Sequence, residues 1–390
     1  MKTVKDLLVD IKDNTELMVD LAYSSIFYDN EDIAEEVLEL EERVGDLFKK
    51  IKKTSALAAR WYEEAKKIVS ILQVANAGQK ISNASADIAL LVLRGYKLSS
   101  EIVNIILYHS EETVVKLEVS ENSEIVGKTL KESKLHTRTG MRVIAIKRGF
   151  NWIFNPKKDV KILKGDILFA RGDPIAVPRF YEVVSGKKIT NVQSPPEIEV
   201  EELDRAVDLL IEMKNLSELA VDLAYSSLIY KNEEVALEVL YLEELIDNKK
   251  FEVLKLLFES SKKLKNVESL IVLLEIAHCA EQIADAAVDI ARVLVDKMEI
   301  PEVFEAAMRE TDEVLVMIRV EDCSSIAGKT LGEAKVETST GMHIIAVKRN
   351  GEWITRPTAN TKILPKDVLI AKGTREGEKS LLELCCKLSD

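Results

Sequence analysis

The chain has 390 residues, of which 47% are hydrophobic and 31% charged, enough for about two to four domains with apolar cores. Its formal net charge of −13 argues against a nucleic-acid partner, because binding to a phosphate backbone needs a basic face. The longest apolar runs, such as IALLVL at 88–93, are far shorter than the roughly 20 residues that span a bilayer. No signal-peptide core stands at the N-terminus, and the four cysteines lack metal-ligand spacing, so we expect a cytoplasmic protein.

Residues 1 to about 109 are predicted to form long helices, because proline is absent there and apolar residues recur at helical spacing. Residues 202 to about 310 are nearly free of proline and repeat the apolar spacing, and small residues along one face predict close helix packing. The members of this face are Leu270, Leu273, Ala277, Ala280, Ala284, Ala287 and Ala291. The basic run KKIKK at 49–53 belongs to such a helix and is interpreted as a solvated face.

From about residues 111 and 312 the pattern changes to short β-branched runs separated by Gly, Pro and Asn turns. The runs are VVKLEV, RVIAIKR and DILFARG in the first segment and VLVMIRV, HIIAVKR and DVLIAKG in the second. Each segment is therefore predicted to form a small β-sheet with helices on one face.

Gly-Lys-Thr occurs in both segments, in IVGKTL at 125–130 and IAGKTL at 326–331. A phosphate-binding loop also needs an earlier glycine, but those positions hold Asn122 and Cys323. Both copies instead read Thr-x-x-Glu, the capping-box pattern that begins a helix. We therefore predict a helix start here, and no nucleotide site.

The chain contains an internal duplication of one unit. DLAYSSIFY at 20–28 returns as DLAYSSLIY at 222–230, and TGMRVIAIKR at 139–148 returns as TGMHIIAVKR at 340–349. The junction contains Pro-Pro and polar residues and is interpreted as a linker. The predicted segments are a helical bundle at 1–110, an α/β domain at 111–184, the linker at 185–201, a second bundle at 202–311 and a second α/β domain at 312–390. The fold class is thus α+β multidomain.

These motifs carry two resemblances. One block of the sequence resembles the C-terminal ligand-binding domain of RCK and TrkA potassium-transport regulators (TrkA-C). This block contains a first strand, the GKTL helix, the TGMxxIA[IV]KR strand and the LxxD[IV]LxxxG motif. The helical block, with ELAVD at 218–222 and EQIADAAVD at 281–289, resembles PhoU, whose domains are antiparallel helical bundles. Full RCK regulators also carry a Rossmann domain, but this sequence has no GxGxxG, so no nicotinamide cofactor is expected.

Acidic residues on the second bundle are candidate metal ligands, with a divalent or transition metal as the expected ion. Five of them follow one helix at spacings of three and four, and the other two form an i, i+4 acidic pair on the first helix of the same bundle. Like charges at that spacing repel each other unless a cation is bound. The candidates are Glu218, Asp222, Glu275, His278, Glu281, Asp285 and Asp289. The resemblance to PhoU adds to this reading, and an ordinary solvated acidic face is the alternative. The first copy has the neutral Gln79 and Asn83, so metal is expected mainly in the second bundle.

Basic and polar side chains at one strand of each α/β domain are candidates for binding an anionic small molecule. They are Arg142, Lys147, Arg148, His343, Lys348 and Arg349. Exposed strand-end charges are the alternative reading. The resemblance to TrkA-C implies ligands such as cyclic di-adenosine monophosphate or another anionic nucleotide, bound between two copies of the domain. Because the unit is duplicated, we expect the two α/β domains to pair about an approximate two-fold axis, within one chain or between chains.

No catalytic constellation is evident. A di-iron bundle needs carboxylates and histidines from four helices, but the chain has four histidines in all, and three of them lie outside the helical stripe. The expected function is therefore a non-enzymatic, ligand-sensing regulator of cation transport, with potassium as the cation. Its expected partner is a membrane potassium transporter or channel subunit, through which it would be membrane-associated, and homodimers are left open. The alternative is a PhoU-type metal-binding adaptor in phosphate uptake signalling.

Overall fold

The computed structural model describes residues 2–58, 61–109, 113–187, 198–264, 267–311, 313–355 and 357–385. The chain forms two compact units, each built from two separate segments. A helical unit comprises residues 1–110 and 194–311, and an α/β unit comprises residues 111–193 and 312–390. Like segments of the two copies thus associate with each other. Most of the predicted linker at 185–201 lies outside the described residues.

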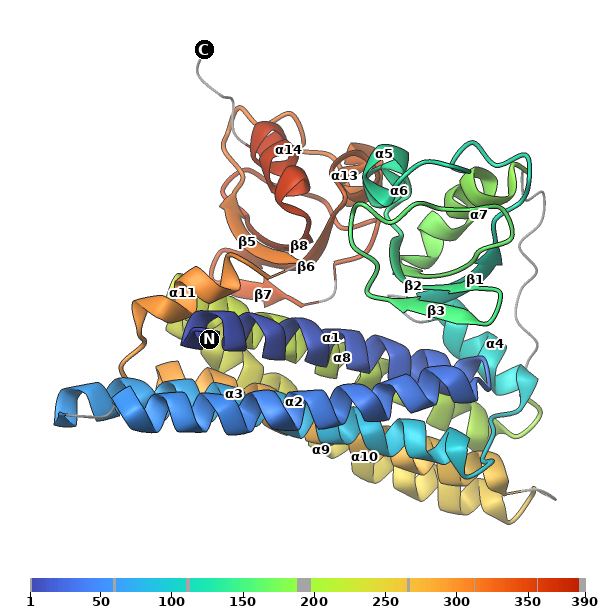
Figure 1. The fold of residues 1–390 in the computed structure, drawn as a ribbon, viewed down its shortest axis with the longest axis horizontal. Helices are drawn as coiled ribbons and strands as arrows, with labels where there is room; N and C mark the ends of the chain where they lie inside the picture. Colours follow the sequence, from blue (N-terminus) through green and yellow to red (C-terminus); the bar gives the residue numbers. More distant parts are fainter. Residues whose placement is uncertain are drawn as a thin grey trace. The chain divides into compact units, whose positions relative to one another are not determined.

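The helical unit consists of two equivalent sets of three long helices and one short helix (Figure 1). The first set is α1 (Val4–Phe27), α2 (Glu31–Ala58), α3 (Tyr62–Leu93) and α4 (Ser100–His109). The second set is α8 (Glu201–Tyr230), α9 (Glu233–Ser261), α10 (Glu268–Val295) and α11 (Glu302–Met308). The predicted bundles are confirmed. Within the described residues, no helix is both long enough and apolar enough to cross a membrane.

The alanine-rich face of α10 is buried, as its spacing predicts. Small side chains allow close helix packing, and α10 packs against α8 and α9 of its own set and against α3 of the other. The contact between α3 and α10 also carries polar bonds: Gln73 Nε2 donates to the Asp289 carbonyl at 2.7 Å, and Lys80 pairs with the Asp289 carboxylate at 2.6 Å.

The duplication is also evident in a reciprocal contact between α1 and α8. Lys12 lies over the ring of Tyr225, 5.5 Å from its centroid, and Lys214 lies over the ring of Tyr23 at 5.1 Å. Both lysines are buried, and each pairs with a glutamate one turn later on its own helix. Equivalent residues of the two bundles therefore hold each other in the helical unit.

The α/β unit holds two four-stranded antiparallel sheets of the same topology (Figure 1). The first domain contains β1 (Thr113–Glu118), α5 (Leu130–Ser133), α6 (Leu135–Thr139), β2 (Arg142–Arg148), β3 (Asn151–Phe154), β4 (Ile167–Gly172), the 3-10 turn η1 (Pro174–Ala176) and α7 (Val177–Ser185). The second contains β5 (Val314–Arg319), α12 (Leu331–Ala334), α13 (Val336–Thr340), β6 (Met342–Arg349), β7 (Glu352–Ile354), β8 (Val368–Gly373) and α14 (Arg375–Cys385). The strand orders are β1-β4-β2-β3 and β5-β8-β6-β7.

Gly-Lys-Thr begins a helix in both domains, as predicted. Thr129 Oγ1 accepts from the Glu132 amide at 3.1 Å, and the Glu132 carboxylate accepts from the Thr129 amide at 2.8 Å. Thr330 and Glu333 form the same capping box at the start of α12. These bonds satisfy amides that a new helix leaves unpaired.

The glycine that ends β4 and β8 permits a close backbone approach. A Cβ on Gly172 would lie 2.6 Å from the Gly140 carbonyl oxygen, and one on Gly373 would lie 2.5 Å from the Gly341 carbonyl oxygen. Since real Cβ atoms do not come this close to backbone, both positions require glycine. This contact explains the final glycine of the repeated LxxD[IV]LxxxG pattern.

The two α/β domains contact each other through equivalent elements, α6 and α13. A Cβ on Gly140 would lie 3.5 Å from the Glu337 side chain, and one on Gly341 would lie 3.5 Å from Thr137 Cα. Because residues 136–141 correspond to 337–342, these contacts are reciprocal, as an approximate two-fold axis requires. The domains therefore pair within one chain.

Candidate ligand pockets of the paired domains

A buried carboxylate joins the two α/β domains. Glu313, just before β5 of the second domain, lies 3.1 Å from the Arg142 guanidinium and 3.9 Å from that of Arg171, both in the first domain. Lys372 of its own domain approaches the same oxygen at 3.5 Å. Burial alone would raise the pKa of Glu313, but Arg142, Lys372, Arg171 and His136 together hold it well below the usual value. Glu313 is thus a charged anion at neutral pH.

A cavity of ≈ 770 Å³, the first pocket, lies beside this cluster. The first domain contributes most of its lining, and the second domain contributes Thr374, Arg375 and Glu376. Its basic side chains are Lys131, Lys134, Arg142, Lys157, Lys158 and Arg375, and its carboxylates are Asp159 and Glu376. Burial lowers the pKa of His136, another lining residue, so its imidazole is neutral at pH 7. The volume falls in the range typical of small-molecule sites, and the charge favours an anion.

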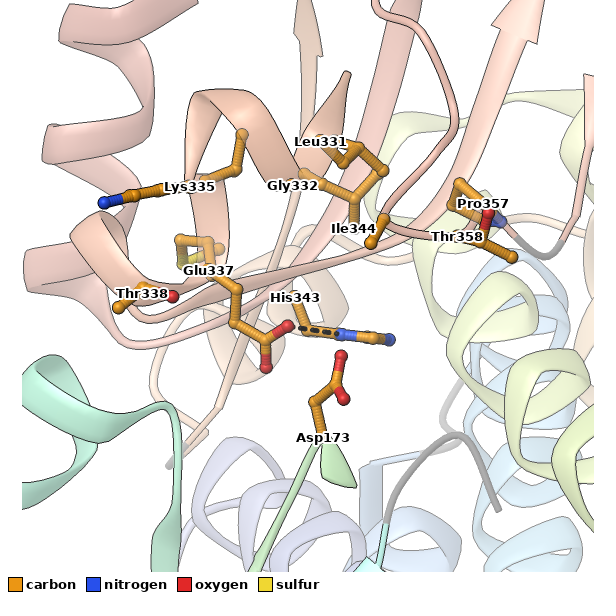
Figure 2. A pocket seen from close by; sticks show the side chains of 13 residues that line it. Asp173, Leu331, Gly332, Lys335, Glu337, Thr338, His343, Ile344, Pro357 and Thr358 are labelled. Atoms are coloured by element: carbon orange, nitrogen blue, oxygen red, sulfur yellow. Dashed lines mark hydrogen bonds and ion pairs between the residues drawn. The ribbon is translucent and has the colours of Figure 1, made fainter. Parts of the chain in front are cut away.

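The equivalent cavity of the second domain, the second pocket, has ≈ 140 Å³. Its described lining includes Lys335, Glu337 and His343 of the second domain and Asp173 of the first. Figure 2 shows Glu337 and Asp173 pointing toward the His343 ring, while Lys335 points away from it. His343 Nδ1 and the Glu337 carboxylate are 3.3 Å apart. Both pockets thus need residues from both domains.

The six predicted ligand-binding residues do not form one site, because they lie at opposite ends of their strands. Arg142 and His343, at the beginning, line the first and second pockets respectively. Lys147 and Lys348, near the end, lie over Trp152 and Trp353 at 5.0 and 5.5 Å from the ring centroids.

Arg148 and Arg349 are held by buried aspartates. The Arg148 guanidinium donates to both carboxylate oxygens of Asp166 at 2.8 Å, and Arg349 bonds Asp367 in the same way at 3.0 and 2.7 Å. Each aspartate also accepts from a backbone amide three residues earlier. In the described structure these arginines therefore hold the turn before β4 or β8, and they line neither pocket.

Four lysines of the first pocket were not among the predicted residues: Lys131, Lys134, Lys157 and Lys158. They follow the GKTL helix start and the Asn-Pro turn at 155–156, and neither location by itself indicates a site. Alignment of the two copies would have drawn attention to Lys131, Lys157 and Lys158, because the second copy has Gly332, Thr358 and Ala359 there.

Three of the seven predicted metal ligands lie beside lysines. Glu218 pairs with Lys214 at 2.8 Å, Glu281 with Lys250 at 2.9 Å, and Asp289 with Lys80. His278 Nδ1 lies 3.4 Å from Glu281, and Asp222 is buried. Within the part of the chain that the structure describes, no three His, Cys, Asp or Glu side chains are grouped as metal ligands. The metal site therefore stays a prediction.

An acidic pair on α9 faces the predicted stripe on α10. Burial raises the pKa of Asp285, with Glu281 and Asp247 raising it further. Burial likewise raises the pKa of Glu243, with Asp247 and Asp285 as further causes. Glu243 and Asp247 repeat the E-x-x-x-D spacing of residues 281–285, a signal present in the sequence but missing from our prediction.

Comparisons with known proteins give two domain matches, each found twice. The TrkA-C domain model matches residues 114–185 and 315–385, and the PhoU domain model matches residues 8–92 and 210–294. The four matches alternate along the chain and cover both copies.

Among curated proteins, potassium channel protein 1 of Methanocaldococcus jannaschii is 29% identical over 86 residues. That match covers 22% of this chain and 26% of the relative, so the chain spans about a quarter of the relative's length. Among solved structures, PhoU from Pseudomonas aeruginosa is 12% identical with a TM-score of 0.41, covering 76% of this chain and 96% of that one. The GsuK channel is 13% identical with a TM-score of 0.20, covering 80% and 65%. Scores this low add nothing to the fold described above.

Proposed function

Since the chain is a duplicated fusion of PhoU and TrkA-C domains, we propose that it is a non-enzymatic, ligand-sensing regulator of cation transport. The observation that carries this proposal is the first pocket, a basic cavity lined by both TrkA-C domains. An anionic small molecule is the ligand that such a lining favours. Cyclic di-adenosine monophosphate and other anionic nucleotides are the first candidates.

Arg142 links the pocket to the pairing of the two domains. Its side chain lines the first pocket and also pairs with the buried Glu313 of the other domain. An anion in the pocket would share this guanidinium with Glu313 and so change the interaction between the domains. A ligand shifts a conformational equilibrium only through a difference in its affinity for two states. We propose that competition for the Arg142 guanidinium is the source of that difference.

Potassium is the proposed cation, and the curated relative supports this choice because it is a potassium channel protein. We propose that this chain acts in the cytoplasm on a membrane potassium transporter or channel subunit. The PhoU bundles would carry the change in the TrkA-C pair to that partner. A homodimer remains a further proposal.

Calorimetric titration of the full chain tests the ligand-sensing part of this proposal. We expect cyclic di-adenosine monophosphate, ATP or another anionic nucleotide to bind, and Arg375→Ala to weaken the binding because this residue reaches the pocket from the second domain. Lys262→Ala, an exposed basic residue of the helical unit, is the control. Absence of binding by every nucleotide would remove ligand sensing from the account.

A second candidate function is a PhoU-type metal-binding adaptor in phosphate uptake signalling. The raised pKa values of Asp285 and Glu243 favour it, because crowded carboxylates are relieved by a bound cation. Elemental analysis of the purified chain discriminates between the two functions. Stoichiometric transition metal without bound nucleotide would favour the adaptor.

A further inference from the structure

The duplication places two equivalent pockets in the α/β unit, and their linings differ. Resting on the proposed function, we infer that only the first pocket binds the anionic ligand, one molecule with two or more phosphate groups per chain. The second pocket lies at the contact between the domains and binds no anion. The first α/β domain thus supplies most of the ligand site, and the second domain completes the lining of that site.

The two pockets correspond residue by residue. Leu130, Lys134 and Thr137 in the first match Leu331, Lys335 and Thr338 in the second. Each pocket also takes the residue that follows the last strand of the other domain, Thr374 in the first and Asp173 in the second. Any difference between them therefore arises from substitutions and not from a different architecture.

The substitutions remove positive charge from the second pocket. Gly332, Thr358 and Ala359 stand where the first pocket has lysines, and His343 stands where it has Arg142. The first pocket has six lysines and arginines against two carboxylates, and the described lining of the second has one lysine against two carboxylates. Arg356, which matches Asn155, lies outside the described residues, and one added arginine would only make the charges equal.

Glu337 and Asp173 make the second pocket unsuited to an anion. Glu337 replaces His136 and pairs with His343 at 3.3 Å, and Asp173 points toward the same ring (Figure 2). A phosphate placed beside these two carboxylates would be repelled by both. The cavity of ≈ 140 Å³ is also smaller than typical small-molecule sites, which have roughly 300 Å³ or more.

The net positive charge of the first pocket indicates how much negative charge its ligand carries. Its lysines and arginines exceed its carboxylates by four. One phosphate group carries at most about two negative charges, so a single group leaves part of the lining uncompensated. Lys131 and Lys158 are neighbours, because the Lys131 amide donates to the Lys158 carbonyl at 2.9 Å. A ligand with two or more phosphate groups therefore matches this cluster of cations better.

The test is calorimetric titration of the full chain with cyclic di-adenosine monophosphate, ATP and inorganic tripolyphosphate. The first-pocket variant is Lys131→Gly, Lys157→Thr and Lys158→Ala, which installs the residues of the second copy at three exposed positions. Lys335→Ala in the second pocket is the matched control. We expect one site per chain in the wild type, about a hundredfold weaker binding in the first-pocket variant, and unchanged binding in the control.

Thermal denaturation of each variant, compared with wild type, separates lost binding from lost folding. Two equivalent sites per chain, or binding that the first-pocket variant leaves unchanged, would overturn the inference and leave the proposed ligand sensing intact. Absence of binding by all three probes would overturn both.

Discussion

Replacement of Glu313 by Gln is expected to destabilise the α/β unit. The carboxylate is buried and faces the guanidinium groups of Arg142 and Arg171 and the ammonium group of Lys372. Removal of one partner of a buried ion pair costs about 3–5 kcal/mol, because the remaining charge stays buried without compensation. The three cations are 24%, 12% and 9% exposed and keep some hydration, so we expect the lower end, about 3 kcal/mol.

Urea unfolding followed by tryptophan fluorescence measures this loss, since Trp152 and Trp353 belong to the two sheets. Glu310→Gln is the control, because Glu310 pairs with Lys5 on the surface at 2.9 Å, and exposed pairs contribute less than about 1 kcal/mol. A Glu313→Gln variant as stable as Glu310→Gln would refute the reasoning.

The pH dependence gives an independent check on Glu313. Its pKa is lowered by folding, so its contribution to the free energy of unfolding is complete above the pKa of the unfolded chain. The contribution is lost as pH falls through the lower pKa of the folded state. We therefore expect the difference between wild type and Glu313→Gln to be largest at neutral pH and to shrink in acid. A difference that grows as pH falls would contradict this sign.

Three further predictions concern the strand-end arginine and the acidic stripe. Arg148→Ala should lower the free energy of unfolding by about 3 kcal/mol, because it removes the guanidinium that pairs with the buried Asp166. The control Lys147→Ala should lower it by less than about 1 kcal/mol. Equal losses of the two variants in urea unfolding would be inconsistent with this prediction. Asp285→Asn should raise the free energy of unfolding by about 0.2–0.5 kcal/mol at neutral pH. Because folding raises the Asp285 pKa, this gain should vanish in acid. Destabilisation of the variant at pH 7 would show that the Asp285 charge is needed for stability. Glu281→Gln combined with Asp285→Asn should abolish any bound divalent or transition metal, measured by elemental analysis after dialysis, and metal retained by this variant would place the ion elsewhere.

Local patterns were sufficient to predict the helices and sheets. The alanine spacing on α10 and the capping boxes at Thr129 and Thr330 describe interactions within a few residues, so they can be recognised in a sequence. The capping box also recurs 201 residues later, at Thr330, which supports its interpretation as a helix start.

The pockets could not be predicted in the same way, because each is assembled from both copies. Arg375 and Lys131 are far apart in the chain but line one cavity. Arg148 was interpreted as an exposed strand-end charge or ligand-binding residue, and only the sheet brings Asp166, 18 residues later, against it. Partners at such separations depend on the three-dimensional fold and not on local spacing.

The acidic stripe shows the same limit. Spacing along α10 predicts a single stripe for Glu281 and Asp289, but it gives no information about the neighbouring helices. The structure places Lys250 of α9 beside Glu281 and Lys80 of α3 beside Asp289. Lysines therefore compensate part of the charge that a metal was expected to neutralise.

Potassium uptake in the native host tests the central claim most directly. A strain lacking this protein would be complemented with wild type or with the first-pocket variant, Lys131→Gly, Lys157→Thr and Lys158→Ala, and rubidium and phosphate uptake would be measured side by side. Regulation of cation transport through the pocket predicts that rubidium uptake differs between the two complemented strains while phosphate uptake stays the same. Altered phosphate uptake with unchanged rubidium uptake would contradict the account and favour the metal-binding adaptor.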